Sequence, residues 1–359
     1  MSRFFDNKLR TVEAYVPGEQ PKNVGELIKL NTNESPFPPS PAVIRAVDSA
    51  AVRDLRLYPD PTCASLANAL SQQFGVEPSQ VTFGNGSDEL LAFCFHALCG
   101  NGAAFADITY GFYKVFAKMF SVAAEIVPLR EDYTLAVEDY ARCAGTVFIA
   151  NPNAPTGIAL KRGQIEELLQ NKERLVIVDE AYVDFGADSA VPLLSKYDNL
   201  LVIGTFSKSR QLAGARLGYA VGSEELIADL NTLRFSFNPY NINRLTLLAG
   251  EAAVQDAPYF DYCRKLIIEN RQYVSEKLRG LGFRVLPSMT NFVFAGPQEG
   301  LSGKEYYEAL RSRNILVRYF DQDRLREFVR ITIGTTDQMD ALISATKDIL
   351  GVEDYDCDY

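Results

Sequence analysis

The stretch that decides the fold runs from Asn199 to Tyr219 and reads NLLVIGTFSKSRQLAGARLGY. Its apolar run, residues 200–203, leads into small polar residues, as expected where a buried strand ends in a turn. Lys208 stands in this turn between two serines. Burial at the mouth of a strand lowers the pKa of a lysine and makes its amine a nucleophile toward an aldehyde. Taken alone, however, a Ser-Lys-Ser is more often a solvated loop lysine.

The residues around Lys208 favour the chemical interpretation. Arg216 follows after a run of small residues, and Thr205 and Ser207 add two hydroxyls. A fixed cation and two hydroxyls can therefore converge with the amine on one small anionic cofactor. The segment SKSRQLAGARLGY resembles the lysine segment of fold-type I pyridoxal-phosphate aminotransferases, most of all that of the histidinol-phosphate aminotransferases. The resemblance implies that Lys208 bonds the cofactor covalently and that Thr205, Ser207 and Arg216 bind it.

The composition limits the class of protein. The chain has 359 residues, 47% of them hydrophobic, and single cores stop growing near about 250–300 residues, so we expect two domains. The net charge of −10 argues against a nucleic-acid or anionic-membrane partner. No stretch approaches the roughly 18 apolar residues of a membrane span. These features predict a soluble, cytoplasmic protein.

Cysteine and histidine usage excludes several kinds of site. The six cysteines form no CxxC pair, which favours buried reduced thiols over disulfides or a metal centre. The single histidine, His96, lies in an apolar run that predicts a core helix and a structural role. The sequence therefore offers neither a histidine-based triad nor a metal site.

The first thirty residues are rich in Pro, Gly and Asn and predict an extended arm. YVPGEQP and IKLNTNESP are similar to the entry segment of histidinol-phosphate aminotransferases. The resemblance implies that Tyr15 lies near the substrate, although a packing aromatic is an equal alternative, and that the segment from Asn33 to Pro36 lines the entrance. Tyr58, in the following Tyr-Pro, matches the residue that in this family reaches the cofactor phosphate of the other subunit. A homodimer is therefore expected.

The chain changes character near residue 245. Residues 60–250 alternate between strand and helix patterns, which predicts a mainly parallel sheet covered on both faces. Beyond them come a long amphipathic pattern over 256–280, several short strands and a final helix. We expect an arm (1–30), a large α/β domain (31–245) and a small α+β domain (246–359). The resemblance implies a seven-stranded sheet sandwiched by helices in the large domain.

Two further loops of the large domain carry candidate cofactor residues. In VTFGNGSDELL a glycine loop opens a helix, an arrangement that faces backbone N–H groups toward an anion, although such a loop is more often just a turn. The resemblance implies that Gly86, Ser87 and Asp88 hold the cofactor there. Tyr110 follows the next strand, where its ring can lie over a heteroaromatic cofactor, the alternative being a core tyrosine.

The next two strand ends carry the remaining candidates. NPNAPTG resembles a family turn in which the asparagine before the proline bonds the cofactor's phenolic oxygen; here that position is Ala154, so we assign the contact to Asn153. In RLVIVDEAYVDFG an apolar strand ends at Asp179, and Tyr182 follows. A carboxylate against the pyridine nitrogen makes the ring an electron sink, and the tyrosine can bond the phenolic oxygen. Taken alone, Asp179 is also a plausible helix cap.

Two arginines of the C-terminal part bear on the substrate. Arg318 stands in ILVRYF and Arg330 in FVRITIGT, both strand-like runs. An arginine among β-branched residues needs a carboxylate partner or an anion. The resemblance implies that both bind the substrate's acidic group, and two guanidinium forks suit a phosphate dianion. Structural salt bridges are the alternative.

The resemblance spans Tyr15 to Thr335 and implies a complete reaction. It is amino transfer between L-histidinol phosphate and 2-oxoglutarate, giving imidazole-acetol phosphate and L-glutamate in histidine biosynthesis, with pyridoxal 5'-phosphate as cofactor. The alternatives are a threonine-phosphate decarboxylase, an aromatic-amino-acid aminotransferase and, outside catalysis, a pyridoxal-phosphate-binding regulatory domain. No helix-turn-helix segment is evident and Lys208 is retained, which argues against the regulatory alternative.

Overall fold

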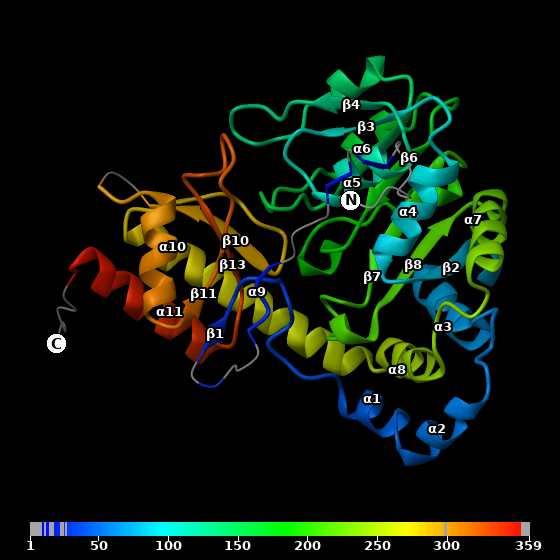
Figure 1. Cartoon of the computed structure of the whole chain (residues 1–359), viewed down its shortest axis with the longest axis horizontal. Coiled ribbons are helices and arrows are strands. Elements are labelled where there is room, and N and C mark those ends of the chain that lie inside the picture. The colour runs from blue at the N-terminus through cyan, green and yellow to red at the C-terminus, as the bar shows by residue number, and fades with distance from the viewer. Residues whose placement is uncertain are drawn as a thin grey trace.

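A computed structural model describes residues 9–10, 12–13, 18–21, 25, 27–297 and 300–352. Figure 1 shows their arrangement. The helices are α1 (Pro41–Ala46), α2 (Ser49–Arg53), α3 (Ala64–Phe74), α4 (Ser87–Ala97), α5 (Phe112–Met119), α6 (Arg162–Leu168), α7 (Glu224–Phe237), α8 (Arg244–Gln255), α9 (Ala257–Gly280), α10 (Gly303–Ser312) and α11 (Thr336–Leu350). The strands are β1 (Ile28–Lys29), β2 (Val81–Asn85), β3 (Ala103–Ala106), β4 (Ala124–Val127), β5 (Thr146–Ala150), β6 (Val176–Asp179), β7 (Leu200–Thr205), β8 (Leu217–Gly222), β9 (Arg284–Val285), β10 (Phe292–Gly296), β11 (Ile315–Leu316), β12 (Arg318–Tyr319) and β13 (Val329–Thr332).

A seven-stranded sheet forms the centre of the larger part, in the order β2-β8-β7-β6-β5-β3-β4. β8 is antiparallel to both of its neighbours, and the pairs from β7 to β4 are parallel. The carboxyl ends of β2, β3, β5, β6 and β7 therefore meet at one edge. The predicted mainly parallel, seven-stranded α/β fold is confirmed.

Helices cover both faces of this sheet because its inner strands are apolar on both sides. In β5, Phe148 packs in the cluster formed with α4, α5 and α7, whereas Val147 and Ile149 pack on the opposite face with α6. This alternation follows the two-residue period of a strand. The sheet is thus held rigidly, which fixes the positions of its strand ends.

A second, antiparallel sheet of order β12-β13-β10-β9 lies beside the first (Figure 1). Helices α9, α10 and α11 pack on it and share one apolar cluster with it. β1 pairs in parallel with β11, so a segment early in the chain lies against this C-terminal part. The predicted smaller α+β part is confirmed.

The predicted border between residues 245 and 246 falls inside α8. Buried Ala249 and Ala253 of α8 pack with Leu66 and Leu70 of α3, in the cluster that also holds strands of the large sheet. The three-part division stays a prediction, and this packing favours a border after Gln255.

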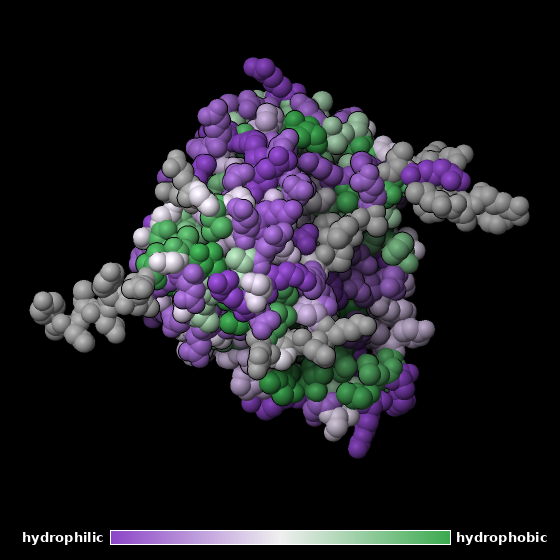
Figure 2. Space-filling model, turned by 60° about the vertical axis from the view of Figure 1, so that its left-hand side comes forward, coloured by the Kyte–Doolittle hydropathy of each residue, from purple (hydrophilic) through white to green (hydrophobic). Residues whose placement is uncertain are grey.

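The surface and the cysteines agree with a globular protein of ordinary type. Figure 2 shows mostly hydrophilic side chains across the middle of one face, with apolar side chains gathered toward its edges. Among the helices of the described residues, none is long and apolar enough to cross a membrane.

The five cysteines within the described residues are all free and buried. The predicted core helix around His96 forms as α4 and buries Leu90, Leu91, Phe93, Cys94 and Phe95, whereas His96 lies on its exposed side.

Candidate active site

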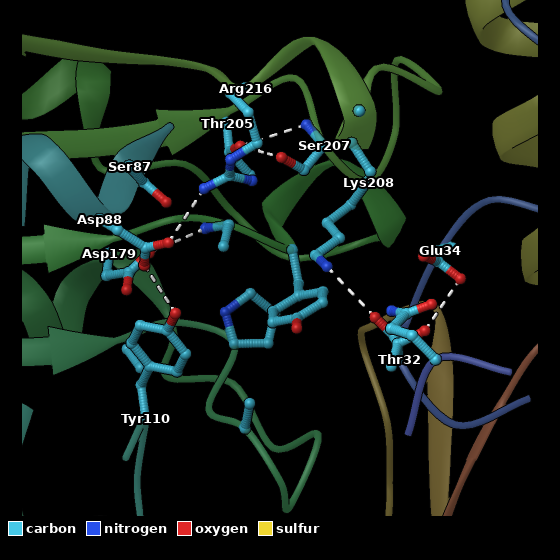
Figure 3. Close-up of a pocket in the computed structure, with 18 residues that line it drawn as sticks. Thr32, Glu34, Ser87, Asp88, Tyr110, Asp179, Thr205, Ser207, Lys208 and Arg216 are labelled. Atoms are coloured by element: carbon cyan, nitrogen blue, oxygen red, sulfur yellow. Dashed lines mark hydrogen bonds and ion pairs between the residues drawn. The ribbon is translucent and has the colours of Figure 1, made fainter. Parts of the chain in front are cut away.

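A cavity of about 450 Å³ opens at the carboxyl edge of the large sheet. Ala150, Asp179 and Thr205, the last residues of β5, β6 and β7, line its floor. Open α/β sheets bind ligands at this edge because strand ends and helix N-termini converge there. Figure 3 shows Lys208 reaching into the cavity from one side, with Asp88 and Tyr110 on the other.

Lys208 is the nucleophile candidate of this cavity. Its Nζ lies 3.5 Å from the carbonyl oxygen of Thr32 and 6.0 Å from the centroid of the Tyr182 ring. Burial, and secondarily the nearby Arg330 guanidinium, lowers the pKa of Lys208 to about 8. Near neutral pH an appreciable fraction of the amine is therefore uncharged and able to attack a carbonyl carbon.

One end of the cavity carries groups that can bind an anion. α4 begins there without a side-chain cap, so the positive end of the helix faces the cavity. Gly86 precedes the helix with φ +79°, and a Cβ at this position would lie 2.4 Å from Nη2 of Arg216. Thr205 and Ser207 line the same end, with their hydroxyl oxygens 2.9 Å apart. Cation, hydroxyls and helix terminus thus surround one space.

Asp88 contacts both Arg216, at the anion-binding end, and the ring-bearing Tyr110. It forms an ion pair with Arg216, Oδ2 to Nη2, at 3.1 Å. Its Oδ1 accepts a hydrogen bond of 2.6 Å from the hydroxyl of Tyr110. The carboxylate therefore positions both the guanidinium and the tyrosine that line the cavity.

Asp179 faces the cavity from the end of β6. Its Oδ2 accepts a 2.9 Å hydrogen bond from the hydroxyl of Tyr113, and its Oδ1 accepts one of 3.2 Å from the backbone N–H of Ala181. Burial raises the pKa of Asp179 to about 6, which leaves the carboxylate mostly ionised at pH 7. A buried carboxylate at this place can hold a proton on a basic ring nitrogen.

Buried Asn33 and partly buried Tyr182 form a hydrogen-bonded pair beside the cavity. Asn33 has φ +55°, is only 2% exposed, and donates from Nδ2 to the hydroxyl of Tyr182 at 2.9 Å. Its backbone N–H donates to the Thr332 hydroxyl, and its carbonyl accepts from Asn291. Because the Tyr182 oxygen accepts from Asn33, its own proton remains available to the cavity.

A second cavity, of about 340 Å³, adjoins the first and shares Tyr110, Ala154 and Tyr182 with it. Arg318 and Arg330 line it from directly opposed positions on β12 and β13. Like charges opposite one another in a ladder repel. An arginine pair in this position suits an anion with two negative charges.

Comparison with known proteins places the chain in a family. The sequence profile of aminotransferases of class I and II matches residues 25–345. The chain belongs to this aminotransferase family. A protein of Clostridium beijerinckii named histidinol-phosphate aminotransferase is 46% identical over 98% of both chains. Histidinol-phosphate aminotransferase 1 of Bradyrhizobium diazoefficiens is 48% identical over 98% of this chain and all of its own.

A solved structure supports the fold of this aminotransferase. Histidinol-phosphate aminotransferase of Sinorhizobium meliloti, in complex with pyridoxal-5'-phosphate, superposes with a TM-score of 0.85 and covers 98% of both chains. The identity is 24%, so this likeness bears on the fold alone.

Most of the predicted cofactor residues come together in the first cavity of this aminotransferase. The residues that line it are Ser87, Asp88, Tyr110, Asp179, Tyr182, Thr205, Ser207, Lys208 and Arg216. Gly86 stands just behind them as the residue before α4.

The other predicted residues lie elsewhere. Asn153 does not line the cavity; its amide donates to the Ile108 carbonyl and the Thr156 hydroxyl, which turns it away. Tyr58 is 77% exposed and stacks on Tyr240. Tyr15 lies outside the described residues. Asn33, expected at the entrance, is buried behind Tyr182 instead.

Sequence reasoning missed Thr32 and Tyr113. Thr32 lines the cavity directly before the segment 33–36 that was expected at the entrance, and Glu34 of that segment lines the cavity as well. Tyr113 contacts Asp179 from α5, one helical turn after Tyr110. The apolar residues around Tyr113 predict core packing and gave no signal for this contact.

Proposed function

We propose that this aminotransferase uses pyridoxal 5'-phosphate to transfer the amino group between L-histidinol phosphate and 2-oxoglutarate in histidine biosynthesis. The observation that carries the proposal is Lys208, a buried amine with a lowered pKa in the same cavity as an anion-binding end. A cofactor that carries an aldehyde and a phosphate could react with the Lys208 amine and bind at the anion-binding end. The two relatives at 46% and 48% identity, which bear this name over nearly their full length, support the substrate.

The residues present fit this cofactor at both ends. The N-terminus of α4, Thr205, Ser207 and Arg216 would hold the phosphate, and the φ of +79° at Gly86, beside the Arg216 guanidinium, favours glycine there. Asp179 would hold a proton on the ring nitrogen. When bound, the cofactor supplies an aldehyde carbon for an amine and a ring that accepts negative charge.

Lys208 carries the proton chemistry. Its Nζ would hold the cofactor covalently. As a free amine, Lys208 would act as the base that removes and returns the proton at the carbon bearing the substrate's amino group. The hydroxyl of Tyr182, which accepts a hydrogen bond from Asn33, would donate toward the cofactor's phenolic oxygen. With Ala154 at the usual asparagine position and the Asn153 amide bonded to Ile108, Tyr182 would be the donor to that oxygen.

The adjoining cavity would bind the substrate's phosphate through Arg318 and Arg330. We further propose a cytoplasmic homodimer. Free buried thiols suit a reducing compartment, and the high exposure of Tyr58 suits a residue that serves a neighbouring subunit.

The test is a stopped-flow absorbance titration of the cofactor-loaded protein with L-histidinol phosphate. Rapid loss of the lysine-bound cofactor band, reversed by 2-oxoglutarate, is the expected result. An unchanged band with histidinol phosphate, together with release of carbon dioxide from threonine phosphate, would overturn the proposal in favour of a decarboxylase.

A further inference from the structure

Tyr113 is a fully buried tyrosine whose hydroxyl reaches the cavity's carboxylate. It lies on α5, is 0% exposed, and its Oη is 2.9 Å from Oδ2 of Asp179. The rings of Phe95, Phe105 and Phe148 surround it, with centroids 5.6 to 6.2 Å away. This packing leaves the ring no alternative position, so the hydroxyl is a fixed donor.

We propose that Tyr113 is a positioning residue that acts through Asp179, keeping its carboxylate ionised and aimed at the ring nitrogen of the bound cofactor. The inference rests on the proposed function, because Asp179 has this task only when a pyridine ring is bound.

The surroundings of Asp179 explain why such a donor is needed. The ionisable groups that influence it are Tyr113 on α5, Asp88 on α4 and Tyr182 beyond β6. Burial and the charge of Asp88 both raise the pKa of Asp179, whereas the hydrogen bonds from Tyr113 and the Ala181 N–H lower it. Tyr113 therefore opposes the two effects that would neutralise the carboxylate.

A tyrosine suits this position better than a basic residue would. An ionised carboxylate only accepts hydrogen bonds, so the Tyr113 hydroxyl must donate. Burial first, and then the charge of Asp179, raises the pKa of Tyr113 well above its usual value, so the hydroxyl keeps its proton. A lysine or arginine would neutralise the charge that the ring nitrogen needs, whereas a neutral donor stabilises it and leaves it available.

The experiment compares Tyr113→Phe with Tyr306→Phe. Both tyrosines are 0% exposed and hydrogen-bonded, but Tyr306 contacts Thr346 in the C-terminal cluster. The apo proteins are titrated with pyridoxal 5'-phosphate from pH 5.5 to 8.5, and the dissociation constant is read from the bound-cofactor absorbance. We expect Tyr113→Phe to bind about tenfold more weakly at pH 7, since a hydrogen bond to a charge is lost. Its loss of affinity on acidification should also begin at higher pH.

A second background separates positioning from packing. In Asp179→Asn, which cannot ionise, adding Tyr113→Phe should change the dissociation constant by less than about twofold. An equal loss in both backgrounds, or a Tyr113→Phe titration that matches Tyr306→Phe, would overturn the inference. A wild-type protein that does not bind the cofactor at any pH would instead overturn the proposed function itself.

Discussion

Burial shifts the pKa values of Lys208 and Asp179 in opposite directions, and each shift favours the uncharged form of the group. Burial lowers the pKa of Lys208 to about 8 and raises that of Asp179 to about 6. Both shifts follow from the cost of taking a charge out of water. Between these values the amine is partly neutral while the carboxylate stays ionised, which is the combination needed by a nucleophile beside a proton-holding acid.

The first prediction concerns the rate at which apo protein attaches pyridoxal 5'-phosphate. Only the neutral amine attacks, so the rate should rise about tenfold per pH unit below pH 8 and level off above it. Stopped-flow absorbance measures it. Lys208→Ala should show no attachment and no turnover, whereas Lys265→Ala, at an exposed helix position, should match wild type. A rate that is flat between pH 6 and 9 would contradict the shifted pKa.

Asn33 provides a second prediction at this scale. Asn33→Gly preserves the φ of +55° but removes the amide that donates to Tyr182 and accepts from Thr332. We expect a loss of about 1–3 kcal/mol in the free energy of unfolding, together with a lower kcat. Asn314→Gly is the control, because Asn314 also has a positive φ but is exposed. Equal effects of the two substitutions in urea titrations and kinetics would show that the amide does not matter.

At the scale of elements, the turn into α4 depends on a glycine. Gly86→Ala would force a side chain into a positive φ and against Arg216, so cofactor affinity should fall more than tenfold. Gly75→Ala is matched, with φ +68° at the end of α3 and open space around its Cβ. Both variants should lose about 1–2 kcal/mol of stability, but only Gly86→Ala should lose affinity in cofactor titrations. Affinity loss in both would point to a general effect of strain.

The elements also show what a sequence can and cannot predict. The ends of β6 and β7 were predictable, because in each a run of aliphatic residues stops at one polar side chain, Asp179 or Thr205. The pairing of β1 with β11 was not, since two residues that pair across almost the whole chain leave no local pattern. The same applies to Tyr113, whose apolar helix surroundings predict core packing and do not indicate that its hydroxyl meets a strand from another part of the chain.

At the scale of the whole molecule, residues 30–33 connect the two parts. The backbone of Leu30 accepts from Thr332 on β13, and Arg330 on the same strand donates to the Asn31 carbonyl at 3.0 Å. The next residues, Thr32 and Asn33, contact Lys208 and Tyr182. Residues 30–33 thus connect β13, the strand of the smaller sheet that carries Arg330, with the cavity at the edge of the seven-stranded sheet.

A fourth prediction tests whether Arg330 of the smaller sheet binds the substrate and not the cofactor. Arg330→Ala should raise KM for histidinol phosphate more than tenfold, because an anion loses a charged donor. The dissociation constant of the cofactor should change less than threefold. Arg326→Ala, at an exposed position paired with Asp323, is the control. Cofactor binding that falls in step with the rise in KM would place Arg330 at the cofactor instead.

The last prediction asks whether one site is built from two chains. Within its own chain Tyr58 is exposed, stacks on Tyr240 and does not line the cavity that contains Lys208. If Tyr58 reaches the cofactor phosphate of a second subunit, Tyr58→Ala and Lys208→Ala homodimers should both be impaired. Mixing the two chains should restore activity, because each mixed dimer then contains one site with both residues.

Differently tagged chains, co-expressed and purified through both tags, give the mixed dimer for this measurement. Its activity should approach half that of wild type per dimer. A mixed dimer no more active than its parents would show that Tyr58 serves the site of its own chain, since both sites would then lack one residue. A chain that sediments as a monomer of 39.9 kDa would contradict the dimer itself. Recovery of activity is therefore the stronger result, because mixing can restore a site only where subunits share it.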